Sequence, residues 1–295
     1  MAWAGQTWAT AFKETTYGTF NGSGATLFPV LYQGNAFTPR KVPMRQVIRS
    51  ADAFNKRRSV SANRYGVRGT LNTLLYPSQA PYWATALTPT GTPPVLPSYS
   101  FEFYDSVRAW KLLGGIIEKF TVTSTSDQDY VSISVDWIFQ SVDETFTTFN
   151  QPAQSNYPTE NPYAHIETSG NISLGGTAIT KYKSMTVTAS NVLTAPFDES
   201  TTINSCIWCG RDVDFSFVPQ FIAKTLRDDF ENQTALTWII AWVRSAENFT
   251  WTLEASSYFA SVADDLPLNG IGYQTIGNEV FFDKSAATDA TITGA

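Results

Sequence analysis

Polar and apolar side chains alternate strictly in the segment GRDVDFSFVP, residues 210–219. Successive side chains of a β-strand point to opposite faces of its sheet, whereas the side chains of a helix repeat every 3.6 residues. The alternation therefore predicts a strand that has one face on the core and one face in water. The set expected to be buried is Val213, Phe215 and Phe217, and the set expected in water is Asp212, Asp214 and Ser216.

Segments with a similar texture recur along the chain and predict a structure dominated by antiparallel sheet. The sequence is rich in Phe, Tyr, Trp, Thr and Ser, which suit pleated, half-buried surfaces. Two segments have helical patterns, residues 78–87 with Ser78 as the N-cap, and residues 220–230. We therefore predict a mainly β (α+β) fold with one short flanking helix in each half. The predicted strands are residues 41–48, 65–77, 98–106, 110–126, 129–140, 183–193, 205–219, 235–243, 248–259 and 278–284.

The order of the predicted elements occurs twice: a strand, a polar loop, a strand that ends in proline and helix, and then three strands. A chain of 295 residues can form one large domain or two domains of roughly 150 residues. Residues 151–165, between the two runs, are rich in Pro, Asn and Gln, which is typical of a linker or a long surface loop. We therefore expect two similar domains, residues 1–150 and 166–295, joined by a linker at 151–165.

Charge is distributed unevenly. Residues 1–150 hold thirteen Lys and Arg against ten Asp and Glu, and residues 151–295 hold seven against sixteen, so the formal charges are +3 and −9. Residues 40–58 form a basic strip with one carboxylate. A nucleic-acid-binding domain is usually basic overall, and this chain has a formal charge of −6. Two interpretations of the strip stay open: a solvated charge run, or a surface that binds an unlike surface of another copy. The cations of the strip are Arg40, Lys41, Arg45, Arg49, Lys56, Arg57 and Arg58.

The sequence contains no arrangement of side chains that is typical of catalysis or metal binding. The single histidine, His165, lies in the predicted linker without a positioned partner, so we expect a solvated side chain. Cys206 and Cys209, in CIWC, are expected to be two buried thiols that diverge, rather than a redox pair or a disulfide. Carboxylate pairs such as Asp127 and Asp129 suit turns. We expect no enzyme activity, no catalytic residue, no metal and no cofactor.

Nothing in the sequence predicts an export signal or a membrane helix. The N-terminal segment has no cationic stretch followed by an apolar run, which predicts the absence of a signal peptide. The most apolar run, residues 235–243, has about half the length that a membrane-spanning helix needs. We therefore expect a soluble protein that is made in a cytoplasm and has no membrane partner.

Seven segments follow one another along the chain: FKETTYGTF, TPRKVPMRQVIRS, RYGVRGTLNTLLYPSQAPYWATAL, SYSFEFYDS, WKLLGGIIEKFTVTSTSDQDYVSISVDWIFQ, MTVTASNVL and GRDVDFSFVP, the last with the predicted helix after it. In this order they resemble the major tail tube protein of long-tailed (siphovirus-type) bacteriophages. The resemblance implies a structural virion protein with packed antiparallel sheets in a β-barrel-like tail tube fold, which the repeated order would place twice in the chain. It also implies that subunits join edge to edge into rings, and that the rings stack into the hollow tail tube through which the genome is ejected.

The same resemblance implies partners for the chain. The tube would enclose a tape-measure protein, meet tail terminator and tip proteins, and let DNA pass without specific binding, in a virion tail assembled in the host cytoplasm. A ring would hold three two-domain chains, with a homohexamer as the alternative. Asp212 and Asp214 are the candidates for the lumen, because lumenal cations would bind the phosphates of the passing DNA.

The basic strip would act between subunits in such a tube. In the family, a loop after an early strand reaches a neighbouring ring, and residues 50–63 match that loop in place and size. The strip would then bind carboxylates of an adjoining subunit through exposed pairs that contribute about 0–1 kcal/mol each. The candidate carboxylates are Asp228, Asp229, Glu231, Asp264 and Asp265.

Two other classes of protein share some of these features. Nine Trp and thirteen Tyr would suit a soluble β-sandwich that binds carbohydrate or hydrolyses a substrate, which a sugar-binding assay would test. An outer-membrane β-barrel conflicts with the two predicted helices and with the predicted absence of a signal peptide.

Overall fold

The computed structural model describes most of the chain as β-strands. The described residues are 8–21, 25–27, 40–49, 57–104, 109–143, 145, 156–168, 172–195, 203, 205–220, 228–229, 231–265, 273–280 and 290–295. Besides the strands, they form the helix α1 (Ala80–Leu87) and the 3-10 turns η1 (Pro77–Gln79) and η3 (His165–Thr168). The first eight strands are β1 (Trp8–Lys13), β2 (Ala25–Leu27), β3 (Arg40–Arg49), β4 (Arg57–Leu74), β5 (Tyr99–Tyr104), β6 (Ala109–Thr125), β7 (Ser132–Phe139) and β8 (Ser141–Asp143). The other eight are β9 (Ile172–Leu174), β10 (Thr177–Ala178), β11 (Tyr182–Thr194), β12 (Ile207–Pro219), β13 (Leu236–Arg244), β14 (Glu247–Asp265), β15 (Tyr273–Val280) and β16 (Ala290–Gly294).

The predicted mainly β fold is confirmed, and the alternation that predicts it places residues as expected. In β12, Val213, Phe215 and Phe217 are buried, with at most 2% of each residue exposed. Their polar neighbours on the strand lie on the exposed face. β12 is held in register by β11 on one edge and by β15 on the other, so the apolar face stays on the core along most of the strand.

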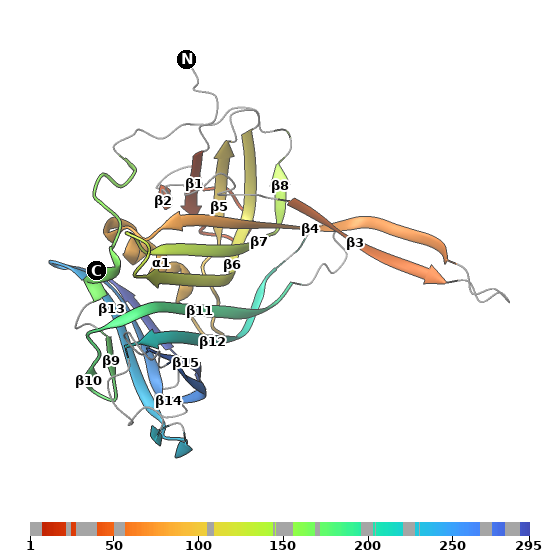
Figure 1. Cartoon of the computed structure of the whole chain (residues 1–295). Coiled ribbons are helices and arrows are strands. Elements are labelled where there is room, and N and C mark those ends of the chain that lie inside the picture. Colours follow the sequence, from red (N-terminus) through yellow and green to blue (C-terminus); the bar gives the residue numbers. More distant parts are fainter. Residues whose placement is uncertain are drawn as a thin grey trace.

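The strands pair in the same order in both halves of the chain (Figure 1). The first eight are linked by antiparallel pairings in the order β2-β1-β5-β6-β7-β4-β3, with β8 also on β6. The second eight are linked in the order β10-β9-β13-β14-β15-β12-β11, with β16 also on β14. One further pairing among the described strands, between β6 and β11, joins the two sets into a continuous sheet.

The long strand β6 belongs to two sheets that pack on each other. Its first part pairs with β5 and β8, and its second part pairs with β7 and β11. The change occurs at Gly114, whose φ is +64°, and at Gly115, where a Cβ would lie 2.6 Å from the ring of Phe139. Figure 1 shows that β1 and β5 consequently run across the direction of β4 and β7. Phe101 of β5 packs edge-on against Trp137 of β7 between the two layers, with 4.8 Å between ring centroids.

One apolar core extends through both halves. Phe120 of β6 lies 5.7 Å from Trp83 of α1 and 6.2 Å from Trp251 of β14, measured between ring centroids. The helix α1 also packs on β16, the last strand, so closely that a Cβ on Gly294 would lie 2.6 Å from the backbone of Ala80. Elements from the two halves of the chain thus bury their apolar surface together.

The described part of the predicted linker lies against the body. Tyr163 is fully buried, donates its backbone N–H to Leu75 and accepts a backbone hydrogen bond from Val131. Arg244 of β13 holds the same segment through two hydrogen bonds to the carboxylate of Glu167 and two to backbone carbonyls. These contacts fix the segment to residues beside the end of β4 and the start of β7 in the first half, and to β13 in the second half.

Three details of the predicted secondary structure differ from the structure. Ser78 is not an N-cap: it lies in η1, and its hydroxyl donates to Glu160 at 2.5 Å, while α1 begins after Gln79 without a side-chain cap. The predicted loop 50–63 is shorter, because β4 begins at Arg57. Gln220 forms a β-bridge with Tyr273 rather than starting a helix, and most of the predicted helix 220–230 lies outside the described residues. In the described part of the chain, no helix is both long and apolar enough to span a bilayer.

Candidate functional site

A broad polar face covers the sheet that runs through both halves. It is formed by β4, β7, β6, β11 and β12, which are neighbours in that order. Along each strand, buried apolar residues alternate with small polar residues that are partly or fully exposed. Side chains bond across the strands: the hydroxyls of Thr121 and Thr188 are 3.2 Å apart, and Thr70 donates to Asp136 at 2.6 Å. The small polar residues of the face include Thr70, Asn72, Thr121, Thr123, Ser132, Ser134, Ser184, Thr186, Thr188, Ser190 and Ser216.

Charged residues on this face are few, and the cations lie near carboxylates. Asp212 and Asp214 are both exposed, opposite Ser190 and Thr188 of β11. Lys119 is directly opposite Asp136 on β7. Arg68 forms an ion pair with Glu118, at 2.9 Å between Nη2 and Oε1, and both side chains are partly in water. The face therefore presents mainly hydroxyl groups and carboxylates to whatever lies above it.

The basic strip contains β3, which pairs with the first part of β4 in a long two-stranded arm. β3 and β4 pair from Arg40 opposite Arg68 to Arg49 opposite Arg57, and the arm extends away from the body in Figure 1. The structure brings together on this arm most of the predicted docking cations. Arg40, Lys41, Arg45 and Arg49 lie on β3, Arg57 and Arg58 lie on β4, and Lys56 lies outside the described residues.

The candidate partner carboxylates lie on two other elements. Asp228, Asp229 and Glu231 lie in a short helical stretch between β12 and β13, and Asp228 and Asp229 are half-buried. Asp264 and Asp265 end β14. The structure contains one chain, so the docking of the strip onto these residues stays a prediction.

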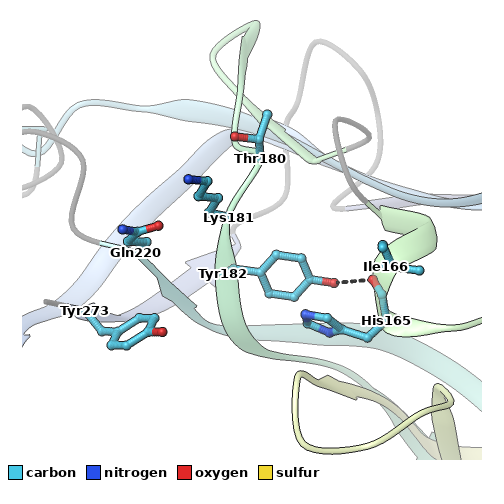
Figure 2. A pocket seen from close by; sticks show the side chains of 7 residues that line it. All are labelled: His165, Ile166, Thr180, Lys181, Tyr182, Gln220 and Tyr273. Carbon is cyan, nitrogen blue, oxygen red and sulfur yellow. Dashed lines mark hydrogen bonds between the residues drawn. The ribbon is translucent and has the colours of Figure 1, made fainter. Parts of the chain in front are cut away.

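A cavity lies beside η3 (Figure 2). It has a volume of about 390 Å³ and is lined by residues that include His165, Tyr182 and Tyr273. The His165 ring packs on the Tyr182 ring at 4.2 Å, and its Nδ1 lies 2.9 Å from the hydroxyl of Ser124. Burial lowers the pKa of His165, although a hydrogen bond involving Tyr182 acts in the opposite direction. His165 is thus half-buried, and its predicted solvated state is wrong.

The Ser124–His165 contact does not form a hydrolytic site. Ser124 is fully buried, so its hydroxyl cannot reach a substrate carbonyl. Tyr182 donates its hydroxyl to the backbone carbonyl of His165, which fixes η3 against β11 (Figure 2). The cluster therefore holds the end of the connector in place, and no described feature favours carbohydrate binding or hydrolysis.

The two cysteines occupy different environments. Both are free: Cys206 is buried, whereas Cys209 is exposed, so the expectation of two buried thiols is wrong for Cys209. Burial raises the pKa of Cys206 to about 12, and so keeps it a thiol at neutral pH. Among the described residues, no three His, Cys, Asp or Glu side chains lie together as metal ligands would.

Comparison with known proteins gives one result for nearly the whole chain. A family model described as phage tail tube protein matches residues 9–294, from β1 to the last residue of β16. A search of curated proteins finds no match.

Proposed function

This chain belongs to the phage tail tube protein family, and we propose that three copies close one ring of the tube, each chain contributing two tube domains. Family membership makes the chain a structural component of the virion tail that assembles with itself and with other tail proteins. The observation that supports a ring of three is the strand order, which is the same for the first eight and the second eight strands. Two equivalent units in each of three chains give a ring with threefold symmetry and approximate sixfold symmetry.

The polar face is the proposed lumen. A surface of hydroxyl groups and carboxylates offers few Lys or Arg side chains that could neutralise DNA phosphates and release the counterions condensed on the DNA. DNA would therefore pass without being retained. Asp212 and Asp214 are exposed on this face and are our lumenal candidates. The same surface would first enclose a tape-measure protein, and the ends of the tube would meet terminator and tip proteins, in a tail assembled in the host cytoplasm.

The arm formed by β3 and β4 is the proposed contact between rings. It extends away from the body and carries six of the seven cations of the basic strip in its described part. Single exposed ion pairs contribute about 0–1 kcal/mol, so the contact would gain its strength by repetition around each ring and along the tube.

The mass and symmetry of an isolated ring test this proposal. Native mass spectrometry of the smallest assembled species should give the mass of three chains, and image reconstruction should show six similar units in each ring. A mass of six chains would favour the homohexamer. Purified protein that stays monomeric at every salt and protein concentration would contradict self-assembly as we propose it.

A further inference from the structure

The strand pairings contain one that lacks a counterpart. Among the described strands, seven pairings of the first eight strands recur in the second eight, and only the pairing of β6 with β11 occurs once. In the common order, β6 corresponds to β14 and β11 corresponds to β3. The missing counterpart is therefore a pairing of β14 with β3.

The edges that this pairing needs are unoccupied by any described strand. The second part of β6 has β7 on one edge and β11 on the other, whereas the second part of β14 has β15 on one edge. Likewise β11 has β12 and β6, whereas β3 has β4 alone. Figure 1 shows β3 and β14 in separate parts of the molecule, so one chain does not join them. Open edges of this kind pair readily with another chain.

A shared irregularity fixes which residues correspond. The pairing of β6 with β7 has a register shift between Ile117 and Lys119, and the pairing of β14 with β15 has one between Phe259 and Ser261. Lys119 therefore corresponds to Ser261. β7 pairs with β4, and β15 pairs with β12 in the same way. The residues opposite one another in these two pairings therefore correspond too, and Val67 corresponds to Val213. Their partners on the next strands, Lys41 and Ala189, then correspond as well.

We propose that β14 pairs antiparallel with β3 of a second copy, in the register that β6 and β11 use within the chain. That internal register sets Lys119 opposite Ser190, Phe120 opposite Ala189 and Thr121 opposite Thr188. The intermolecular pairs are therefore Ser261 with Val42, Val262 with Lys41, and Ala263 with Arg40. This inference rests on the proposed ring, because it names the strands that close it.

The described side chains of β14 suit this role. Ser261 and Ala263 are exposed, and Val262 packs on the core, which is the alternation of Lys119, Thr121 and Phe120 in β6. On the side of β14, the junction would therefore continue the polar face, with Ser261 and Ala263 in the places that Lys119 and Thr121 take in β6.

Charge distinguishes the two junctions. The internal junction has neutral residues at the corresponding positions, where Thr188 is the diagonal neighbour of Thr123 and Ala189 is the diagonal neighbour of Val122. The corresponding residues of the intermolecular junction are Arg40 and Lys41 on β3, and Asp264 and Asp265 on β14. Diagonal neighbours across antiparallel strands lie about 7–8 Å apart, within reach of long side chains. Opposite charges there would favour pairing between chains in this register and disfavour slipped registers.

Disulfide trapping tests the register directly. In a Cys209→Ser background, Val42→Cys and Ser261→Cys should form a disulfide between chains when assembled rings are oxidised, because opposed strand residues have the spacing of a disulfide. The internal control pairs Lys119→Cys with Ser190→Cys, and should crosslink within a chain. The shifted control pairs Met44→Cys with Ala263→Cys, which are four residues out of register and about 13 Å apart, and should give no product. Mixing chains that carry only one of the two introduced cysteines each should give only the crosslinked dimer of unlike chains.

The outcomes separate this inference from the proposed function. Rings that form but crosslink only through the shifted pair, or through no tested pair, would overturn the β14–β3 register and leave the tube role intact. Failure of the protein to form rings would contradict the proposed function itself. A charge exchange adds an independent measurement: Lys41→Glu and Asp264→Lys should each reduce ring formation, and the double variant should recover it. Loss without recovery in the double variant would contradict the predicted proximity of these two residues.

Discussion

Arg244 is the residue whose contacts most directly join the two halves. Its guanidinium binds both carboxylate oxygens of Glu167 and two backbone carbonyls of the connector, and it lies 5.5 Å above the Tyr163 ring. The Glu167 side chain is only 18% exposed. Burial opposes its charge, but hydrogen bonds from Arg244 and from the Ala164 N–H outweigh this and hold the pKa of Glu167 below its ordinary value.

Replacing Arg244 by Met should destabilise the monomer. The change leaves a largely buried carboxylate and two carbonyls without their donor, at a cost of about 1–3 kcal/mol. For a chain of this size, thermal unfolding should shift down by about 2–4 °C for each kcal/mol. The matched control is Arg68→Met, which breaks the more exposed pair with Glu118 and should cost only about 0–1 kcal/mol. Equal shifts for the two variants would show that the connector is not held as we describe.

His165 should make stability depend on pH. Because burial lowers its pKa, the folded protein binds the proton less readily than the unfolded chain. Stability is then fully present above the ordinary histidine pKa of about 6.5, and is lost as the pH falls through that value towards the lower pKa of the folded state. Urea unfolding midpoints measured from about pH 8 to about pH 5 should fall accordingly. In the variant His165→Gln this part of the pH dependence should disappear, and an unchanged profile would exclude His165 as its source.

The burial of single side chains was predictable from the sequence where a strand has one face on the core and the other in water. Val213, Phe215 and Phe217 are buried as the alternation predicts. The predicted exposure of His165 and of Cys209 was wrong, because the exposure of each side chain depends on which distant segments pack against it. His165 is covered by Tyr182, a contact between η3 and β11 that no local pattern contains.

At the scale of elements, long strands were predictable, including β3 of the arm, whereas short strands and the first part of β4 were not. The predicted strands of the core correspond to β5, β6, β7, β11, β12, β13 and β14. Strands of two or three residues, such as β8, β9 and β10, are too short to show a period. The start of β4 was missed because RRSVSAN, on a two-stranded arm, lacks the apolar alternation of a strand that covers a core.

The arm gives a prediction about assembly. Replacing Lys56, Arg57 and Arg58 by Ser should leave the monomer folded and slow or abolish the stacking of rings. The effect should resemble that of high ionic strength on the parent, since salt screens the exposed pairs once the Debye length falls below roughly 8 Å. Light scattering and negative-stain microscopy would follow stacking. The control removes three exposed cations away from the arm, in the variant Lys13→Ser, Lys181→Ser and Lys183→Ser. Parent-like stacking of the arm variant at every salt concentration would support a solvated strip instead.

At the scale of the whole molecule, the sequence contains the repeated order of elements but not the way in which the halves meet. The pairing of β6 with β11 joins strands about sixty residues apart in the chain, and its register follows from tertiary packing rather than from any local pattern. The same pairing brings Thr121 of one half beside Thr188 of the other, and so creates the polar face. The candidate lumen is therefore a property of the assembled sheet, of which β12 alone supplied the first indication.

The polarity of that face leads to a prediction for the assembled tube. Replacing both Asp212 and Asp214 by Lys adds cations to the proposed lumen, at positions that are exposed and outside the apolar core. Tubes of this variant should retain fluorescent duplex DNA at low salt, whereas parent tubes should not. Retention should weaken steeply as salt rises, because each phosphate contact contributes about −0.9 to the log–log slope for duplex DNA. The matched control places the same charges at Asp127 and Asp129, in the exposed turn after β6. If the control tubes bind DNA as strongly as the Asp212 and Asp214 variant, then added charge on any surface is sufficient, and these two residues lose their assignment to the lumen.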